Sequence, residues 1–312
     1  MTALIVPVQS DTLAHAAEIL GRGGLVAIPT ETVYGLACDA ANPEAVARLY
    51  AAKGRPHFNP LIAHVAGQDM AREEGVLSEQ AAAIAQAFWP GPLTLVLPRA
   101  ETGTVCDLAR AGLDSIAIRC PRHPAAHNLI AAFGRPLVAP SANRSGHVSP
   151  TLAQHVADDL ADRIDLILDG GPCTSGIEST IVSFTGESPM LLRKGGVETS
   201  VLKAVLHNDL SIPSDGAIIA PGQLKSHYAP NAALRLNAAA PEEGEAWLGF
   251  GPDSHEGYNL SLKGDLAEAA ANLFAMLRTL DTRSDRIAVA PIPEEGLGEA
   301  INDRLTRAAH RD

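Results

Sequence analysis

The residues best suited to chemistry lie in one short segment, Lys53-Gly-Arg-Pro-His-Phe-Asn-Pro-Leu-Ile-Ala-His64. It carries two fixed cations, two histidines and an amide, and it contains no carboxylate. Because two prolines and a glycine restrict its backbone, we expect a stiff loop. A stiff cationic loop that leads into an apolar strand favours an anion site, although an ordinary basic surface loop can have the same composition.

A second cationic region is the stretch from Ser115 to Ala157, which has no Asp or Glu in a chain of net charge −12. Three hydroxyl-rich turns accompany these cations. Charged forks beside short hydroxyl donors are typical of phosphate or carboxylate recognition. The alternatives are pairing with distant acids and simple turn or cap chemistry. The region carries Arg119, Arg122, Arg135 and Arg144, and the turns are Thr30/Thr32, Ser141–Ser149 and Thr174–Thr180.

Several mechanisms find no support in the sequence. It contains no GxxxxGK[ST] loop, no GxGxxG after a strand, no HExxH and no GxSxG elbow. We therefore expect no metal-ligand set in the protein itself. Glu31 and Glu178 stand in otherwise uncharged loops, where each could act as a base, orient a neighbour or bind a cation.

Length, net charge and cysteine spacing narrow the class of protein further. The 312 residues predict two domains, and the negative charge argues against nucleic acid or anionic membranes as partners. Four widely spaced cysteines predict neither a disulfide framework nor a zinc site. No signal peptide or membrane span is expected, so a cytoplasmic location is predicted.

Alternating apolar patterns predict an α/β fold. We expect a domain at 1–209, a linker that could act as a lid at 210–231, and a small α/β domain at 232–312. Ser10 or Asp11, Ser78 and Thr151 are expected to cap helices. Predicted strands include 3–7, 25–28, 61–65, 93–97, 115–119, 136–139, 165–168, 179–184, 189–193, 234–236, 246–250 and 287–290; predicted helices include 10–22, 42–53, 78–89, 123–133, 151–160, 265–281 and 297–309.

Six motifs follow one another along the chain: Pro29–Leu36, Lys53–Leu61, Trp89–Thr94, Ser115–Pro121, Ala139–Asn143 and Gly176–Ile181. Read together, they resemble the YrdC-like family in order and spacing. The linker and the tail Gly296–Leu305 resemble its longer, two-domain subgroup, so the resemblance covers essentially the whole chain.

The resemblance implies a twisted mixed open sheet with flanking helices and a small Rossmann-like C-terminal domain. It also implies formation of L-threonylcarbamoyladenylate from L-threonine, bicarbonate and ATP, with Mg²⁺, and release of pyrophosphate. Downstream enzymes would then transfer the threonylcarbamoyl group to tRNA. No stable binding of nucleic acid by this chain is expected.

The resemblance also assigns residues to substrates. L-Threonine would be held by Thr32, His64, Arg119, Ser141 and Ser179, with Arg119 facing its carboxylate. The nucleotide would be lined by Lys53, Arg55, Asn59, Ser115, Asn143, Thr151 and Arg193, and His227 or Tyr228 would close over it. Lys53 and Arg55 are the expected catalytic cations, stabilising charge on the departing pyrophosphate.

Two other functions stay open from the sequence. One is an RNA-binding module with a basic concave face, which would bind RNA with a steep salt dependence. The other is a related carbamoyl-adenylating activity that uses carbamoyl phosphate, although such relatives carry additional domains.

Overall fold

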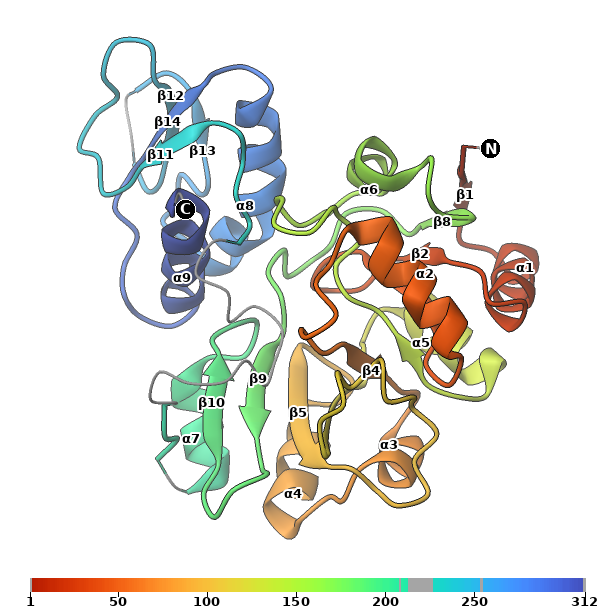
Figure 1. Cartoon of the computed structure of the whole chain (residues 1–312). Coiled ribbons are helices and arrows are strands. Elements are labelled where there is room, and N and C mark those ends of the chain that lie inside the picture. The colour runs from red at the N-terminus through yellow and green to blue at the C-terminus, as the bar shows by residue number, and fades with distance from the viewer. Residues whose placement is uncertain (1, 208, 213–226, 253–254, 311–312) are drawn as a thin grey trace.

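The computed structural model describes residues 2–207, 209–212, 227–252 and 255–310, and these residues form two separate β-sheets (Figure 1). The larger sheet has ten strands and the smaller has four. Helices flank both sheets, so the predicted mixed α/β class is confirmed. Most of the expected linker, residues 213–226 with Lys225, lies outside the described residues.

The large sheet is mixed, in the order β1-β8-β2-β3-β7-β4-β6-β5-β9-β10. Its central strands are buried and mostly apolar, as expected for strands that helices cover on both faces. Side chains of β2 alternate between the two faces: Ala27 enters one apolar core, while Val26 and Ile28 enter another. The strands are β1 Leu4–Pro7, β2 Val26–Ile28, β3 Gly35–Asp39, β4 Ile62–His64, β5 Leu93–Pro98, β6 Ser115–Arg119, β7 Leu137–Val138, β8 Leu166–Asp169, β9 Thr180–Ser183 and β10 Met190–Arg193.

Helix boundaries in this part follow local capping chemistry. The Asn42 side chain accepts hydrogen bonds from two backbone N–H groups at the start of α2, and Gly54 ends that helix in the left-handed conformation. Ser78 caps α4 and His123 caps α5. The helices are α1 Ser10–Gly21, α2 Pro43–Lys53, α3 Gln68–Glu74, α4 Glu79–Phe88, α5 Pro124–Phe133, α6 Ala153–Leu160 and α7 Thr199–Leu206.

Some expectations about these elements were wrong or incomplete. Helix α6 begins at Ala153 with Leu152 as its N-cap residue, so Thr151 does not cap it. In α1 the cap is Gln9, whose backbone N–H donates to Thr12 Oγ1 at 2.9 Å, in place of Ser10 or Asp11. Strands β3 and β13 and helices α3 and α7 were not predicted.

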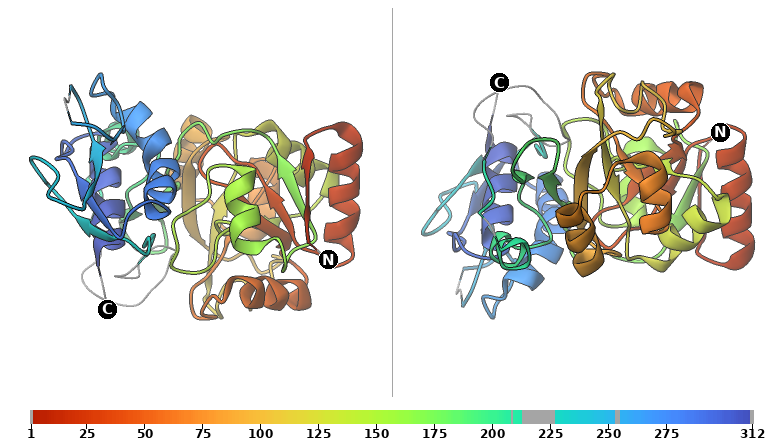
Figure 2. Two further views of the ribbon diagram at one scale, coloured as in Figure 1. Left: turned by 90° about the horizontal axis from the view of Figure 1, so that it is seen from above. Right: turned by 90° about the horizontal axis from the view of Figure 1, so that it is seen from below.

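The smaller sheet and two helices form a C-terminal unit beside the large sheet (Figures 1 and 2). All its strands are parallel, in the order β11-β14-β12-β13. No helix in the described part of the chain is long and apolar enough to cross a membrane. The elements are β11 Ala233–Arg235, β12 Ala246–Gly249, β13 Tyr258–Asn259, β14 Arg286–Val289, α8 Leu266–Asp281 and α9 Gly298–Ala309.

Candidate active site

A small cavity of about 50 Å³ lies where the central strands of the large sheet end. Strands β4 and β6 run parallel with His64 opposite Arg119, so both side chains reach the same sheet edge. Ligands of open α/β sheets usually bind at such an edge. The cavity is lined by Thr32, Val33, Arg55, Ile62, His64, Arg119, Ala139, Pro140, Ser141, Glu178, Ser179, Arg193, His227 and Tyr228.

All five residues expected to hold L-threonine line this cavity: Thr32, His64, Arg119, Ser141 and Ser179. Four residues expected at the nucleotide also line it, namely Arg55, Arg193, His227 and Tyr228. Small-molecule pockets usually measure roughly 300–1,000 Å³. A nucleotide therefore needs space beyond this cavity.

Arg119 is buried and its guanidinium is fixed by three partners. Nη2 lies 2.8 Å from Glu31 Oε1, Nη1 donates to Thr32 Oγ1 at 2.7 Å, and Nε donates to the Gly91 carbonyl at 3.3 Å. Burial alone would raise the pKa of Glu31, but Arg119 and the backbone N–H of Arg122 outweigh it and hold that pKa below its usual value. The carboxylate is thus ionised and orients Arg119, one of the roles considered for Glu31.

His64 is buried beside Arg119, and it is neutral. Burial and the neighbouring guanidinium lower its pKa to about 3. Its Nδ1 lies 3.1 Å from the Ile62 carbonyl oxygen. Since a carbonyl can only accept, Nδ1 carries the proton and Nε2 is left as an acceptor.

Ser179 joins β5, β9 and β10 at the cavity. Its hydroxyl lies 2.7 Å from Thr94 Oγ1. Arg193 donates to the Ser179 carbonyl from Nε at 3.1 Å and from Nη2 at 2.9 Å, and Nη2 also lies 3.1 Å from Ser179 Oγ. Burial lowers the pKa of Arg193, and this cation holds Ser179 in place at the edge of the cavity.

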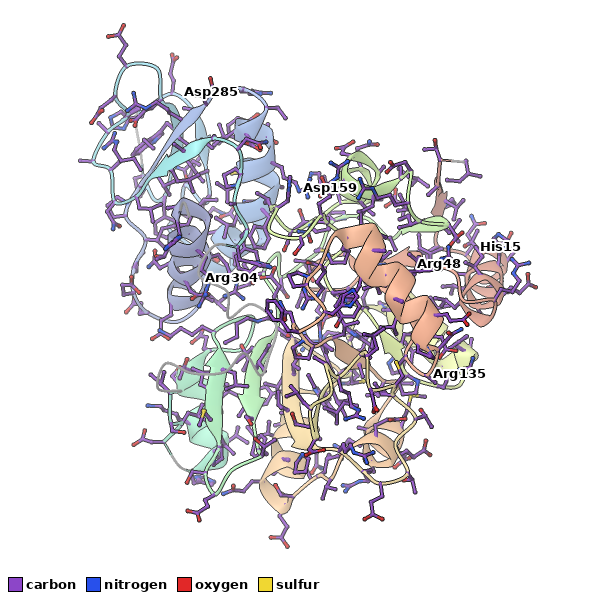
Figure 3. The ribbon with its side chains drawn as sticks, in the orientation of Figure 1. His15, Arg48, Arg135, Asp159, Asp285 and Arg304 are labelled. Carbon is purple, nitrogen blue, oxygen red and sulfur yellow. The ribbon has the colours of Figure 1, made fainter. Side chains whose placement is uncertain are left out.

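Glu178 lines the cavity, and the sequence did not show what neutralises it. Its Oε2 accepts from Arg304 Nε at 2.9 Å, and its Oε1 accepts from Ser149 Oγ at 2.6 Å. Arg304 belongs to α9 and is fully buried; Figure 3 places it on the side of the C-terminal unit that faces the larger part. The carboxylate therefore orients neighbours, and both its oxygens are engaged.

Lys53 and Arg55 follow directly from the end of α2, but they occupy different positions. Lys53 Nζ donates to the carbonyls of Ser141 and Asn143 and does not line the cavity. Burial and the neighbouring Arg55 lower its pKa well below the usual range. Arg55 lines the cavity; burial lowers its pKa only to about 10, so it stays charged. Its guanidinium also donates to backbone carbonyls of its own loop.

Three residues expected at the nucleotide lie outside the cavity and are buried. Asn59 Oδ1, Asn143 Oδ1 and Thr151 Oγ1 have no hydrogen-bond partner within the described residues. Buried polar atoms without partners are uncommon in folded proteins, so each is a candidate ligand-binding atom. Ser115, also expected at the nucleotide, begins β6 four positions from Arg119, and the structure does not bring it to the cavity.

His227 and Tyr228, which resume the described chain after residue 226, close one side of the cavity. Their rings meet edge to face at 4.0 Å, and Tyr228 stacks on Phe274 of α8 at 5.6 Å. Burial lowers the pKa of His227 to about 3 and raises that of Tyr228, so both are neutral. Tyr228 Oη and His227 Nδ1 have no hydrogen-bond partner among described residues.

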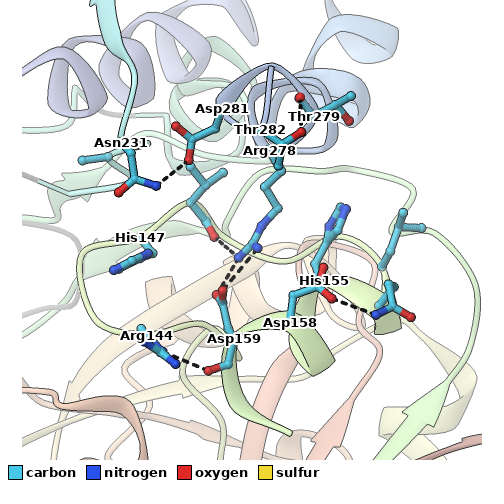
Figure 4. Close-up of a pocket in the computed structure, with 14 residues that line it drawn as sticks. Arg144, His147, His155, Asp158, Asp159, Asn231, Arg278, Thr279, Asp281 and Thr282 are labelled. Atoms are coloured by element: carbon cyan, nitrogen blue, oxygen red, sulfur yellow. Dashed lines mark hydrogen bonds and ion pairs between the residues drawn. The ribbon is translucent and has the colours of Figure 1, made fainter. Parts of the chain in front are cut away.

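A larger groove of about 580 Å³ lies between α6 and α8 (Figure 4). None of the predicted site residues lines it, but its lining includes Arg144, Leu152 and Ala229, the chain neighbours of three of them. Arg278 of α8 reaches across it to Asp159, with Nη2 and Oδ2 2.7 Å apart. Arg144, from the carboxylate-free stretch, donates to the Asp159 carbonyl at 3.1 Å. This groove is a junction between the two parts of the molecule.

The carboxylate-free stretch does not form one cationic wall. Of its arginines, only Arg119 lines the cavity. Arg135 pairs with Asp39 at 2.6 Å, Arg122 donates to the Pro90 carbonyl, and Arg144 lies at the groove. The expectation that distant acids pair with some of them is confirmed for Arg119 and Arg135.

Metal binding by the protein can be tested against the donor set. Among the described residues, no group of three or more His, Cys, Asp or Glu side chains is placed to hold a metal. The carboxylates at the cavity, Glu31 and Glu178, are engaged by Arg119 and Arg304. The residues present therefore do not fit a protein-held Mg²⁺ site.

Comparison with known proteins supplies the family. Residues 18–195 match the family described as "Telomere recombination" (Sua5_yciO_yrdC), and residues 197–310 match "Threonylcarbamoyl-AMP synthase, C-terminal domain". Two relatives named threonylcarbamoyl-AMP synthase are each 40% identical to the chain. The match covers 94% of this chain and 93% of the Pyrococcus abyssi protein, and 95% and 92% for the Bacillus subtilis protein.

A solved structure gives the same result in three dimensions. The crystal structure of P. abyssi Sua5 complexed with L-threonine matches with a TM-score of 0.91 and 36% sequence identity, covering 98% of each chain. The chain belongs to the family of threonylcarbamoyl-AMP synthases.

Proposed function

We propose that the protein joins L-threonine, bicarbonate and ATP into L-threonylcarbamoyladenylate and releases pyrophosphate. The observation that carries this proposal is the cavity in which Arg119 is held by Glu31 and Thr32 beside neutral His64, Ser141 and Ser179. The relatives named threonylcarbamoyl-AMP synthase and the Sua5 complex with L-threonine support the choice of amino acid.

Arg119 is suited to the threonine carboxylate. Hydrogen bonds from Nε and Nη1 use two of its five N–H donors, and Nη2 faces Glu31 as an ion pair, so both terminal nitrogens keep at least one N–H for a ligand. Two parallel donors match a carboxylate in a bidentate pair. His64 Nε2 would accept from the threonine amine or hydroxyl, while Thr32, Ser141 and Ser179 border the same space.

The chemistry then needs positioning more than a protein base. A neutral amine attacks the carbon of CO₂ with loss of a proton, or the carbon of bicarbonate with loss of water, and gives a carbamate. A carbamate oxygen then attacks the α-phosphorus of ATP. The bond from that phosphorus to the β-phosphate oxygen breaks, and pyrophosphate leaves. With a pKa of about 3, His64 is too weak a base to deprotonate an ammonium group. We assign it to orientation.

Arg55 is the cation best placed to stabilise negative charge on the phosphates, because it lines the cavity and stays charged. Lys53 uses two donors on the Ser141 and Asn143 carbonyls, so it has a third donor for a phosphate only in its protonated form, which a bound triphosphate would favour. Asn59, Asn143, Thr151 and Arg193 would hold the rest of the nucleotide, with Tyr228 and His227 closing over it. Ser115 is retained only as a more distant contact.

Mg²⁺ would travel with the triphosphate, since the protein carboxylates nearby are paired with arginines. The product would serve enzymes that transfer threonylcarbamoyl to tRNA. The four free cysteines suit a reducing compartment such as the cytoplasm. The relatives give no support to the RNA-binding module or to the carbamoyl-phosphate reaction.

The test is pyrophosphate release measured with each substrate omitted in turn. Release should need L-threonine, bicarbonate and ATP together, and release without threonine would overturn the proposal. Arg55→Ala should lower turnover at least about tenfold if Arg55 stabilises the departing phosphates. An unchanged rate would remove that role from Arg55.

A further inference from the structure

The C-terminal unit packs against three loops that carry site residues. Its apolar core includes Val33, Val148 and Ile177 from the larger part. Each is the chain neighbour of a polar residue at or near the site: Thr32, Ser149 and Glu178, respectively. The small unit therefore packs against the backbone that presents the site.

The contact at the third loop is especially close. Gly176 has φ +69°, and a Cβ there would collide with the Ala270 carbonyl oxygen and the Ala271 Cα of α8. Only glycine allows α8 to approach this loop so closely. The next turn of chain carries Glu178 and Ser179, both at the cavity.

One buried side chain of the C-terminal unit, Arg304, contacts a residue that lines the cavity. Arg304 donates from Nε to Glu178 Oε2 at 2.9 Å and from Nη1 to the Lys194 carbonyl at 2.8 Å. Its guanidinium lies 5.3 Å from the centre of the Tyr228 ring, within cation–π range. Arg304 thus contacts a cavity carboxylate, a cavity aromatic ring and the chain just after Arg193.

We propose that Arg304 is a positioning residue of the active site: it neutralises Glu178 and, through Glu178, fixes Ser149 and the adjoining Ser179 and Thr151 segments. This inference rests on the proposed function. It makes the C-terminal unit part of the working site, acting through a side chain that does not line the cavity.

The charge of Glu178 explains why neutralisation is needed. The proposed substrates bring a carboxylate and a triphosphate to a cavity that Glu178 lines. An unpaired carboxylate there would repel both anions. The groups that face Glu178 are Arg304 from α9, Arg193 from β10, and the neutral His227 and Tyr228. Without Arg304, Arg193 still opposes the charge of Glu178, but the ion pair at 2.9 Å is lost.

The loss of Arg304 should therefore show in the pH dependence. Burial raises the pKa of Glu178, while Arg304, Arg193 and the Ser149 hydrogen bond together bring it below its usual value. Arg304 is the cation that lowers the pKa of Glu178 most, so replacing Arg304 raises that pKa. At higher pH the group is then an uncompensated anion at the cavity, whereas at lower pH it is neutral.

The experiment compares Arg304→Met with wild type by threonine-dependent pyrophosphate release between pH 6 and 9. We expect kcat/KM to fall at least about tenfold at the highest pH and the loss to shrink as pH is lowered. The double variant Glu178→Gln, Arg304→Met removes the buried carboxylate charge as well. Its kcat/KM relative to wild type should therefore depend less on pH, and at high pH it should be more active than Arg304→Met alone.

Arg278→Met is the matched control. Arg278 also joins α8 to the larger part, through Asp159 and the Val148 and Ser149 carbonyls, but it makes no ion pair or hydrogen bond with Glu178 in the described part of the chain. Any loss in this variant should be uniform over pH. Arg304→Lys, which keeps the charge but not the guanidinium fork, should be intermediate, and it carries the same pH comparison if Arg304→Met does not fold.

A pH-independent loss in the Arg304 variants, with no rescue by Glu178→Gln, would reduce Arg304 to a structural contact and overturn the inference. Wild-type activity in the variants would do so too. If wild type itself releases no pyrophosphate with threonine, the proposed function fails, which is a separate outcome.

Discussion

Two buried ion pairs border the same cavity. In one pair the arginine lines the cavity, and in the other the carboxylate does. In the Glu31–Arg119 pair, at 2.8 Å, both residues belong to the larger part and the arginine lines the cavity. In the Glu178–Arg304 pair, at 2.9 Å, the carboxylate lines the cavity and the arginine comes from the C-terminal unit. In each pair the partner that does not line the cavity supports the one that does.

The difference shows how a cavity for anions can contain a carboxylate. Glu31 orients Arg119 and leaves donors free for an incoming carboxylate. Arg304 instead cancels the charge of Glu178, so that Arg55, Arg119 and Arg193 dominate the cavity. A neutral histidine stands beside each pair: His64 beside Arg119, and His227 near Glu178. Substitutions can separate these two roles.

The largest effect is expected from Arg119→Met. It removes the proposed fork for the threonine carboxylate and leaves Glu31 buried without its cation. Leaving Glu31 buried without its cation should destabilise the fold by about 3–5 kcal/mol. Separately, loss of a bidentate charged contact to the substrate should lower kcat/KM for threonine at least about a hundredfold. Steady-state kinetics with threonine as the varied substrate measures this.

The matched control is Arg135→Met. Arg135 also pairs with a buried carboxylate, Asp39, but lies outside the cavity. Its replacement should destabilise the fold without a specific loss of threonine affinity. Equal kinetic losses in the two variants would contradict the assignment of Arg119 to the substrate.

Gly176→Ala tests the contact through which the C-terminal unit holds the second pair. The new methyl group would meet the α8 backbone, and φ +69° disfavours any side chain. Overpacking and strain together should cost about 3 kcal/mol of unfolding free energy. Urea denaturation measures the cost, and activity should fall with it.

Gly134→Ala separates strain from crowding. Gly134 has φ +76°, but nothing lies within 4 Å of a Cβ placed there. The expected cost is about 1 kcal/mol, from strain alone. If both variants lose the same unfolding free energy, the close approach of α8 to the Gly176 loop adds nothing to the cost of Gly176→Ala.

The first pair was largely predictable from sequence, and the second was not. Strand β6 has the predicted bounds, and Arg119 ends it at an edge where ligands bind. Its carboxylate, Glu31, was singled out as a possible orienting group. Arg304, by contrast, lies 126 residues from Glu178 and within a regular helical pattern, so no local signal joins them.

Local rules also failed where tertiary structure competes with them. Thr151 precedes a helix and has the chemistry of an N-cap, yet the helix starts two residues later and the hydroxyl stays buried without a partner among the described residues. Strand β3 has glycine and alanine among its five residues, and pairing with β2 and β7 holds it in the sheet.

The smallest effect concerns the histidine beside the first pair. Folded His64 has a pKa of about 3, against an ordinary value of 6.5 that the unfolded chain should show. Between these values the unfolded state binds more protons, so stability falls as pH drops below 6.5. His64→Gln removes this pH-dependent contribution to stability. Between pH 8 and pH 5, the unfolding free energy of the variant should therefore fall by about 2 kcal/mol less than that of wild type. Urea denaturation at the two pH values measures it, with His15→Gln on the exposed surface of α1 as the control. An identical pH response in His64→Gln and wild type would mean that folding does not lower the pKa of His64. The assignment of a histidine held neutral by burial to orient the threonine amine would then have to be abandoned.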